Sequence, residues 1–168
     1  MKLAPVAALL TLAAVPLAFA QEQSSATAEF VDQEGETHGT ATLTETPSGV
    51  LIEVEVPGLP PGQWVAFHVH QEGVCDHETE HESAGGHYNP SDTAHGYLAE
   101  GGPHAGDMPN QYVGEDGTLR AQVFNSMVSL DGDNAIRGRA LMVHAGADDY
   151  TSQPSGDAGA RLACGIVE

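Results

Sequence analysis

Two histidines end an apolar segment whose residues alternate in character, VAFHVH at residues 65–70. In a β-strand, residues i and i+2 point to the same face. His68 and His70 therefore share one face, while the two valines and the phenylalanine share the other and are expected to join the core. Two imidazoles on one face can approach a single metal ion. For so short a motif, the alternative is a pair of solvated strand histidines.

Further ligand candidates lie in the segment GGHYNPSDTAHGYLAEGGPHAGDMPN. It supplies three histidines and a carboxylate: His87, His95, His104 and Asp107. This donor set suits a closed tetrahedral zinc site, and a site without an open position is usually structural. Such a site would also order the loop that carries it. His144 ends a later apolar segment, ALMVH, where a lone core histidine is the alternative interpretation.

Alternation with a period of two residues predicts half-buried strands along much of the chain. The expected strands span residues 26–33, 38–46, 49–56, 63–70, 118–125, 137–144 and 160–167. Turn signals such as TPSG, PGLPPG and SLDGDN separate them. The pattern predicts an all-β antiparallel sandwich or barrel of seven or eight strands, with residues 127–136 as the place for one more strand.

Two stretches do not fit the strand pattern. Residues 71–117 are rich in glycine, proline and histidine, and residues 145–160 are polar and rich in small residues. Loops longer than about 12–15 residues are uncommon unless they are functional or disordered. Because so many histidines gather in the first stretch, we expect it to be functional.

The N-terminal segment MKLAPVAALLTLAAVPLAFA has the features of a secretory signal peptide: Lys2, a short apolar run and the small-x-small sequence AFA. A membrane anchor is the alternative, but the run is short and proline interrupts it. We expect a signal peptide at residues 1–20 and one mature domain at residues 21–168, in the periplasm or secreted, without stable membrane insertion. In an exported chain, Cys75 and Cys164 suggest one disulfide, with free thiols or soft metal ligands as alternatives.

The composition is strongly acidic, with 5 lysines and arginines against 24 aspartates and glutamates and a net charge of −19. A polyanion of this kind is repelled by nucleic acid, which is therefore not an expected partner.

Five motifs, in order along the chain, resemble the copper/zinc superoxide dismutases, in particular the exported bacterial type. They are FHVH, GGHYNP, HAGD, RALMVHAGADDY and GARLACG, and they extend over essentially all of the mature chain. The resemblance implies a flattened eight-stranded Greek-key β-barrel, an immunoglobulin-like sandwich with two long functional loops. It also implies a disulfide between Cys75 and Cys164. Family members that share these motifs include monomers and homodimers.

The same resemblance implies one copper ion and one zinc ion per subunit. The implied copper ligands are His68, His70, His87 and His144, and the implied zinc ligands are His87, His95, His104 and Asp107. His87 would bridge the two ions and take part in catalysis by carrying a proton. Arg161 would guide and hold the anion, and Asp148 would link histidine ligands of the two metals.

The implied reaction is the dismutation of superoxide to dioxygen and hydrogen peroxide, by alternate reduction and oxidation of the histidine-bound copper. A non-catalytic copper carrier and a purely structural zinc domain are the alternatives from other classes. Arg161 is unnecessary for a carrier, and a zinc domain does not need His68, His70 and His144 together. Zinc hydrolysis is disfavoured, because the zinc set has no open position.

Two features depart from the family pattern. The segment CDHETEHESAG carries His77 and His81, which match no ligand; we expect solvated loop histidines, with an auxiliary metal patch as the alternative. The chain also has few cations to attract superoxide. We expect local attraction at Arg161 to outweigh the repulsion by the acidic surface, so that activity declines as salt screens it.

Overall fold

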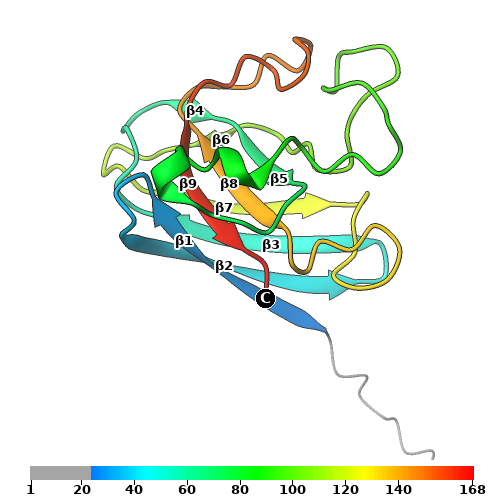
Figure 1. Cartoon of the computed structure of the whole chain (residues 1–168), viewed down its shortest axis with the longest axis horizontal. Coiled ribbons are helices and arrows are strands. Elements are labelled where there is room, and N and C mark those ends of the chain that lie inside the picture. Colours follow the sequence, from blue (N-terminus) through cyan, green and yellow to red (C-terminus); the bar gives the residue numbers. More distant parts are fainter. Residues whose placement is uncertain (1–23) are drawn as a thin grey trace, which may run out of the picture.

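The computed structural model describes residues 24–168, and these form a structure made almost entirely of β-strands (Figure 1). The strands are β1 (Ser25–Asp32), β2 (Thr37–Thr46), β3 (Gly49–Val56), β4 (Trp64–Val65), β5 (Phe67–His70), β6 (Gln111–Tyr112), β7 (Leu119–Asn125), β8 (Ala140–His144) and β9 (Arg161–Ile166). Two single turns of 3₁₀ helix, η1 (His77–Thr79) and η2 (Glu82–Ala84), lie between β5 and β6. The predicted all-β class is confirmed.

Seven strands form one antiparallel sheet in the order β5-β8-β9-β1-β2-β3-β7, and β4 pairs with β6 separately. Strands β1, β2 and β3 follow one another as hairpins, but the chain then crosses to the opposite edge of the sheet to form β5. The sheet is curled, so that β8 and β9 lie across β3 and β7 in Figure 1. This crossing connection between antiparallel strands is of the Greek-key type, as predicted.

The core lies in the space that the curled sheet encloses. Along β1 the buried residues Ala26, Ala28 and Phe30 alternate with exposed ones, as a strand with one buried face requires. The largest apolar side chains that are fully buried come from most parts of the sheet and from the segments between strands: Phe30, Phe67, Leu43, Ile52, Met108, Leu119, Leu130, Ile136, Leu141 and Met142. All of these except Met142 belong to one continuous core, whereas Met142 packs with Ala84, Ala140 and Cys164 in a small second cluster.

The strand predicted at residues 63–70 is interrupted at Ala66, which separates β4 from β5. The backbone of Ala66 bonds instead to crossing segments: its N–H donates to the carbonyl of Gly146 at 2.8 Å, and its carbonyl accepts the N–H of His144 at 3.0 Å. When β4 and β5 are counted as one interrupted strand, the described residues contain the eight strand segments that were expected.

The eighth strand does not lie where the sequence indicated it. Among the described residues, 127–136 form no strand beyond an isolated bridge between Ser129 and Ala135. Polar side chains there bind local backbone instead, Ser129 Oγ donating to the carbonyl of Asp133 at 2.6 Å. Strand β6 lies instead within residues 71–117, where no strand was predicted, because two residues are too few to show alternation.

The long loop predicted at residues 71–117 ends earlier, at residue 110, because β6 follows it, and a second long loop lies at residues 145–160 as predicted. Both loops extend above the sheet in Figure 1. The disulfide between Cys75 and Cys164 is confirmed, with their Cα atoms 5.5 Å apart. It ties the beginning of the first loop to β9, the strand on which Arg161 lies.

The signal peptide predicted for residues 1–20 lies outside the described residues. Within residues 24–168, no helix is long and apolar enough to span a membrane.

Candidate metal centre

Two adjacent antiparallel strands bring three histidines together. His68 and His70 lie on β5, and β8 ends at His144. The β5–β8 ladder places these strands side by side, and an isolated bridge between His70 and His87 brings the fourth histidine in from the long loop. We call His68, His70, His87 and His144 the strand cluster. The valines and the phenylalanine of VAFHVH face the core, as predicted.

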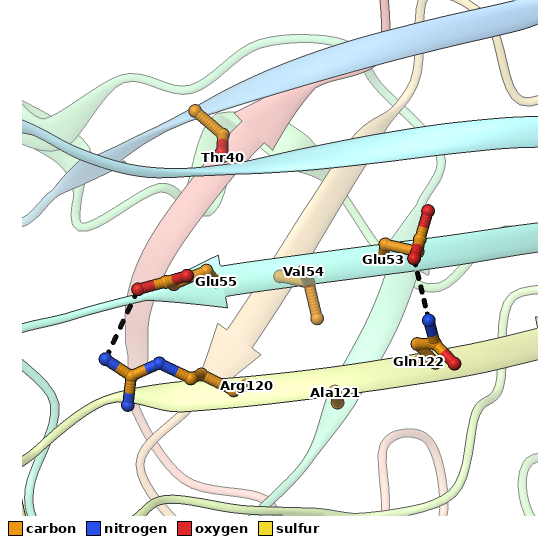
Figure 2. A pocket seen from close by; sticks show the side chains of 7 residues that line it. All are labelled: Thr40, Glu53, Val54, Glu55, Arg120, Ala121 and Gln122. Atoms are coloured by element: carbon orange, nitrogen blue, oxygen red, sulfur yellow. Dashed lines mark hydrogen bonds and ion pairs between the residues drawn. The ribbon is translucent and has the colours of Figure 1, made fainter.

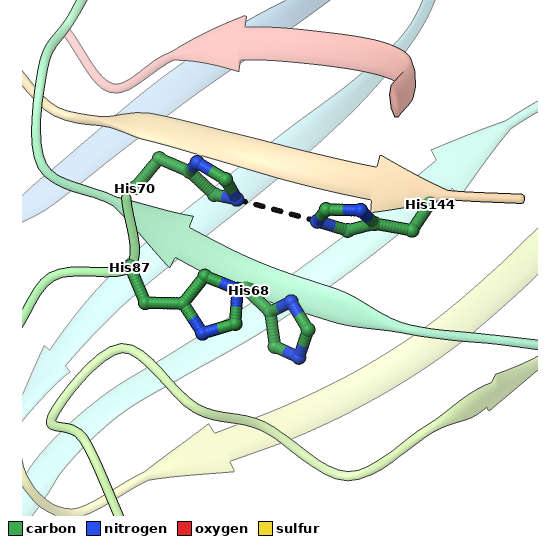
Figure 3. Close-up of side chains that lie close together, drawn as sticks. All are labelled: His68, His70, His87 and His144. Carbon is green, nitrogen blue, oxygen red and sulfur yellow. Dashed lines mark hydrogen bonds between the residues drawn. The ribbon is translucent and has the colours of Figure 1, made fainter. Parts of the chain in front are cut away.

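The four rings of the strand cluster converge (Figure 3). One ring nitrogen from each lies within 4.8 Å of the others. His70 Nε2 and His144 Nε2 are 3.3 Å apart, and the ring centroids of His68 and His87 are 4.0 Å apart. All four residues are buried. Such a convergence of imidazole nitrogens is the arrangement that a metal ion with nitrogen ligands requires.

In three of these rings the outer nitrogen is held by a fixed acceptor. The contacts are His68 Nε2 to Asp148 Oδ2 at 2.8 Å, His70 Nδ1 to the Gly85 carbonyl at 2.9 Å and His144 Nδ1 to the Gly159 carbonyl at 3.4 Å. A proton held on the outer nitrogen leaves the inner lone pair available to a metal. These contacts also fix the orientation of each ring.

A second cluster shares His87 with the first. We call His87, His95, His104 and Asp107 the loop cluster, and each offers a ligand atom within 4.8 Å of the others. The carboxylate of Asp107 lies at its centre, 2.8 Å from His87 Nδ1, and accepts the backbone N–H groups of Gly96 at 2.9 Å and His104 at 3.0 Å. Burial opposes ionisation of Asp107, but the hydrogen bonds from His87 and Gly96 outweigh it, and its pKa lies below the ordinary range.

Buried ring nitrogens without partners mark the ligand atoms. Among the described residues, four such atoms of the two clusters have no hydrogen-bond partner: His68 Nδ1, His87 Nε2, His95 Nδ1 and His104 Nδ1. The last two lie 3.1 Å and 3.3 Å from the Asp107 carboxylate, but not in hydrogen-bond geometry. A buried polar atom left unpaired costs about 1–3 kcal/mol, so four in one place indicate that a further group belongs there. Because Nδ1 of His87 faces Asp107, its Nε2 is left for the strand cluster.

Burial also sets the protonation state of the histidines. Desolvation lowers the pKa of His68 and of His70 well below 6.5, and the neighbouring histidines act in the same direction. It lowers the pKa of His144 to about 4 and also lowers that of His104. Neutral imidazole is the form that binds metal, so at neutral pH these rings are ready to act as ligands.

Asp148 connects the two clusters. Its Oδ2 lies 2.8 Å from His68 Nε2 and its Oδ1 lies 3.0 Å from His95 Nε2. The side chain of Asn110 holds its backbone, accepting the N–H and donating to the carbonyl at 2.8 Å each. Gly156, with φ at +71°, passes so close that a Cβ atom on it would overlap Asp148 Oδ1. The second long loop thus reaches both clusters through one carboxylate.

Known proteins are similar to this chain in both sequence and fold. Residues 37–167 match the family model of copper/zinc superoxide dismutase. The chain belongs to the copper/zinc superoxide dismutase family. It is 45% identical over 162 residues to "Superoxide dismutase [Cu-Zn] 2" of Aquifex aeolicus, with 94% of each chain covered.

Two solved structures support the same fold. The Cu/Zn superoxide dismutase from Brucella abortus superposes with a TM-score of 0.72 at 33% identity, covering 86% of this chain and 100% of that one. A SOD-like protein from Bacillus subtilis gives a TM-score of 0.79 at 35% identity, covering 83% of this chain and 95% of that one. The predicted family and its bacterial type are therefore confirmed.

In this dismutase-family chain, a cavity of about 480 Å³ opens beside the strand cluster, with His70, His87, His144 and Arg161 among its lining residues. The guanidinium of Arg161 donates to the carbonyl of His81 at 2.7 Å and to that of Gly85 at 2.9 Å. The Gly85 carbonyl also accepts from His70, so one backbone group positions both the arginine and a cluster histidine. Arg161 therefore faces the same cavity as the strand cluster.

A second hollow, of about 410 Å³, lies on the outer face of β2, β3 and β7 (Figure 2). Exposed polar pairs cross from β3 to β7 there: Arg120 lies 3.3 Å from Glu55, and Gln122 donates to Glu53 at 2.7 Å. Its lining contains no histidine or cysteine. This hollow is a row of cross-strand pairs rather than a metal centre.

The structure brings every residue of the predicted ligand set into one of the two clusters, but the prediction for His81 was wrong. Its ring is completely buried, and among the described residues neither ring nitrogen has a partner. His77 is exposed, as predicted. Neither joins a group of metal-ligand type within the described residues. The carbonyls of Gly85 and Gly159 were missed, because backbone acceptors leave no signal in residue type.

Proposed function

We propose that residues 21–168 form an exported superoxide dismutase that binds one copper and one zinc ion per subunit. The observation that carries this proposal is the position of His87, which belongs to both clusters through its two ring nitrogens. Family membership supports the reaction, the conversion of superoxide to dioxygen and hydrogen peroxide.

The donor sets of the two clusters differ in the way that the two metals require. The strand cluster offers four imidazoles, which suit copper, and it borders an open cavity. The loop cluster offers three imidazoles and a carboxylate, a closed set that suits structural zinc. When bound, copper supplies the one-electron chemistry by which superoxide is oxidised in one half of the cycle and reduced in the other.

The chain's own residues orient the substrate and move the proton. Arg161 presents a charged donor to a small anion beside His70 and His144. His87 holds a proton at Nε2 in one half of the cycle and gives it to the reduced product in the other, and the second proton of hydrogen peroxide comes from water. Its Nδ1 stays oriented by the loop cluster throughout. Asp148 keeps the rings of His68 and His95 in fixed orientations.

Export is supported by two features of the chain. Residues 1–20 have the composition of a secretory signal peptide, and the bond between Cys75 and Cys164 suits an oxidising compartment. We therefore place the mature enzyme in the periplasm or outside the cell. Export would separate the signal peptide from the domain that starts at residue 21.

The proposal is tested by measuring metal content and superoxide consumption together. The mature protein, loaded with both metals, is expected to hold one copper and one zinc per chain and to consume superoxide. His144→Ala should lose more than about 100-fold in turnover and keep its zinc, because His144 belongs to the strand cluster alone. His38→Ala, a change at a half-exposed histidine that pairs with Asp32 outside both clusters, is the control and should behave as wild type. Copper binding without turnover in the wild type would show a carrier instead.

A further inference from the structure

The cavity beside the strand cluster has a carboxylate at its mouth that no part of the mechanism uses. Glu82, in η2, lines this cavity and places Oε2 3.3 Å from the guanidinium of Arg161. The side chain of Glu82 is 72% exposed, whereas that of Arg161 is 14% exposed. The carboxylate is therefore the more exposed member of the pair and lies beside the cavity through which an anion would reach Arg161.

The backbone holds Glu82 in this place. Its immediate neighbour His81 and the nearby Gly85 provide the two carbonyls that bind the guanidinium, so the segment around Glu82 wraps the arginine. The buried residues His81 and Ala84 fix this segment from inside, and the disulfide from Cys75 ties its beginning to β9. The pairing of Glu82 with Arg161 is thus built into the fold.

The charges that line the cavity make this pairing consequential. Arg161 is the one arginine or lysine among the lining residues, and Glu82 and Asp92 are the two carboxylates. An anion that binds Arg161 must replace or approach Glu82, and the electrostatic cost of that approach rises in proportion to the anion's charge. This electrostatic cost is about twice as large for a doubly charged anion as for a singly charged one.

We propose that Glu82 is a specificity-determining residue that competes with anions for Arg161. It lowers the rate constant for superoxide capture by a small factor. It lowers the affinity for doubly charged anions, such as hydrogen phosphate, by about the square of that factor. Selectivity is a difference between affinities, so a repulsive group can improve it even when it slows the preferred substrate. The proposal rests on the proposed role of Arg161 as the anion-binding residue.

The test compares three variants of the enzyme loaded with both metals. Glu82→Gln removes the competing charge, while Glu78→Gln removes the same charge from an exposed position in the same segment that has no described ion pair. Arg161→Gln removes the anion-binding group. The measurements are the superoxide rate constant from low to high ionic strength, inhibition by hydrogen phosphate near pH 8, and the rate at which phenylglyoxal modifies Arg161. Exposed Arg120 serves as the internal reference for modification.

For Glu82→Gln we expect the low-salt rate constant to rise about two- to fivefold, the range for a partly exposed ion pair. The rate should also fall more steeply with salt, and phosphate should inhibit at a concentration lower by about the square of the rate gain. Phenylglyoxal should modify Arg161 faster, and phosphate should protect it more strongly. Glu78→Gln should change each quantity less than half as much.

Equal behaviour of Glu82→Gln and Glu78→Gln in all three measurements would overturn the proposal, because only general surface charge would then matter. The proposed dismutase function can fail separately: in that case the wild type consumes no superoxide. If the wild type is active but Arg161→Gln keeps full activity and unchanged phosphate inhibition, Arg161 does not bind the anion, and the role of Glu82 falls with it.

Discussion

The strand cluster and the loop cluster share His87 but are built in different ways. In the strand cluster, His68, His70 and His144 come from two hydrogen-bonded strands, and their outer nitrogens are held by backbone carbonyls or by Asp148. In the loop cluster all four members come from the loop of residues 71–110, and the three histidines converge on the carboxylate of Asp107.

This difference separates what the fold provides from what a ligand must provide. A strand ladder sets the positions of its side chains whether or not a metal is present, because the backbone bonds and the core hold it. A long loop has fewer such restraints, and the free energy of metal binding becomes part of its folding free energy. We infer that the strand cluster is preorganised by the sheet and that the loop cluster organises the loop.

The largest effect is expected from removing the one carboxylate of the loop cluster. Asp107→Ala takes away a charged ligand and the acceptor of the Gly96 and His104 N–H groups. Zinc affinity should fall by more than the roughly 100-fold that loss of an outer partner costs. Amide exchange should accelerate in residues 71–110 and at Val69 of β5, whose N–H donates to the carbonyl of Gly106 in that loop, and it should stay unchanged in β8. Faster exchange in β8 would show that both clusters depend on zinc and would remove the contrast between them.

A smaller effect is expected at the carboxylate that joins the clusters. Asp148→Asn keeps the shape of the side chain but gives it only one oxygen, so it can accept from His68 or from His95 but not from both. Loss of such an outer partner lowers metal affinity by about 10–100-fold, measured by competition with a chelator. Zinc should be affected more than copper, because His68 remains on a strand. Asp157→Asn, at an exposed carboxylate in the same loop, should match wild type.

The smallest effect concerns the pH dependence of folding stability, and it involves His81 in the loop segment that ends at Gly85. Burial lowers the pKa of His81 in the folded chain, while nearby Asp32 acts in the opposite direction and His77 and Arg161 add to the lowering. In the unfolded chain the ring titrates near 6.5. Below that pH the unfolded state takes up a proton that the folded state refuses. This contribution to stability is therefore present above pH 6.5 and is lost as the pH falls toward the folded-state pKa.

His81→Leu should therefore weaken the loss of stability between pH 7 and pH 5, by at most about 1.4 kcal/mol per pH unit. Denaturant unfolding of the metal-loaded protein at several pH values measures this slope. Leucine at φ +60° adds strain, but that strain is independent of pH and cancels from the slope. Identical slopes for variant and wild type would mean that His81 is not a buried neutral ring.

Much of the fold and of the ligand set could be predicted from sequence because both depend on local patterns. Alternation located β3 correctly, and the same alternation placed His68 and His70 on one face. The features that could not be predicted depend on contacts between segments that are far apart in the sequence. The interruption at Ala66 arises from bonds to Gly146 and His144, and the burial of His81 arises from the packing of the 76–85 segment against other elements.

Gly156 has a consequence for how sequences of this kind vary. It lies in a polar loop that is mostly exposed, the sort of segment in which substitutions are usually harmless, yet it leaves no room for even a methyl group beside Asp148 and His95. A chain can therefore retain all seven ligand side chains and still lose the connection between its two halves. A check for the seven ligand residues alone would not detect this loss.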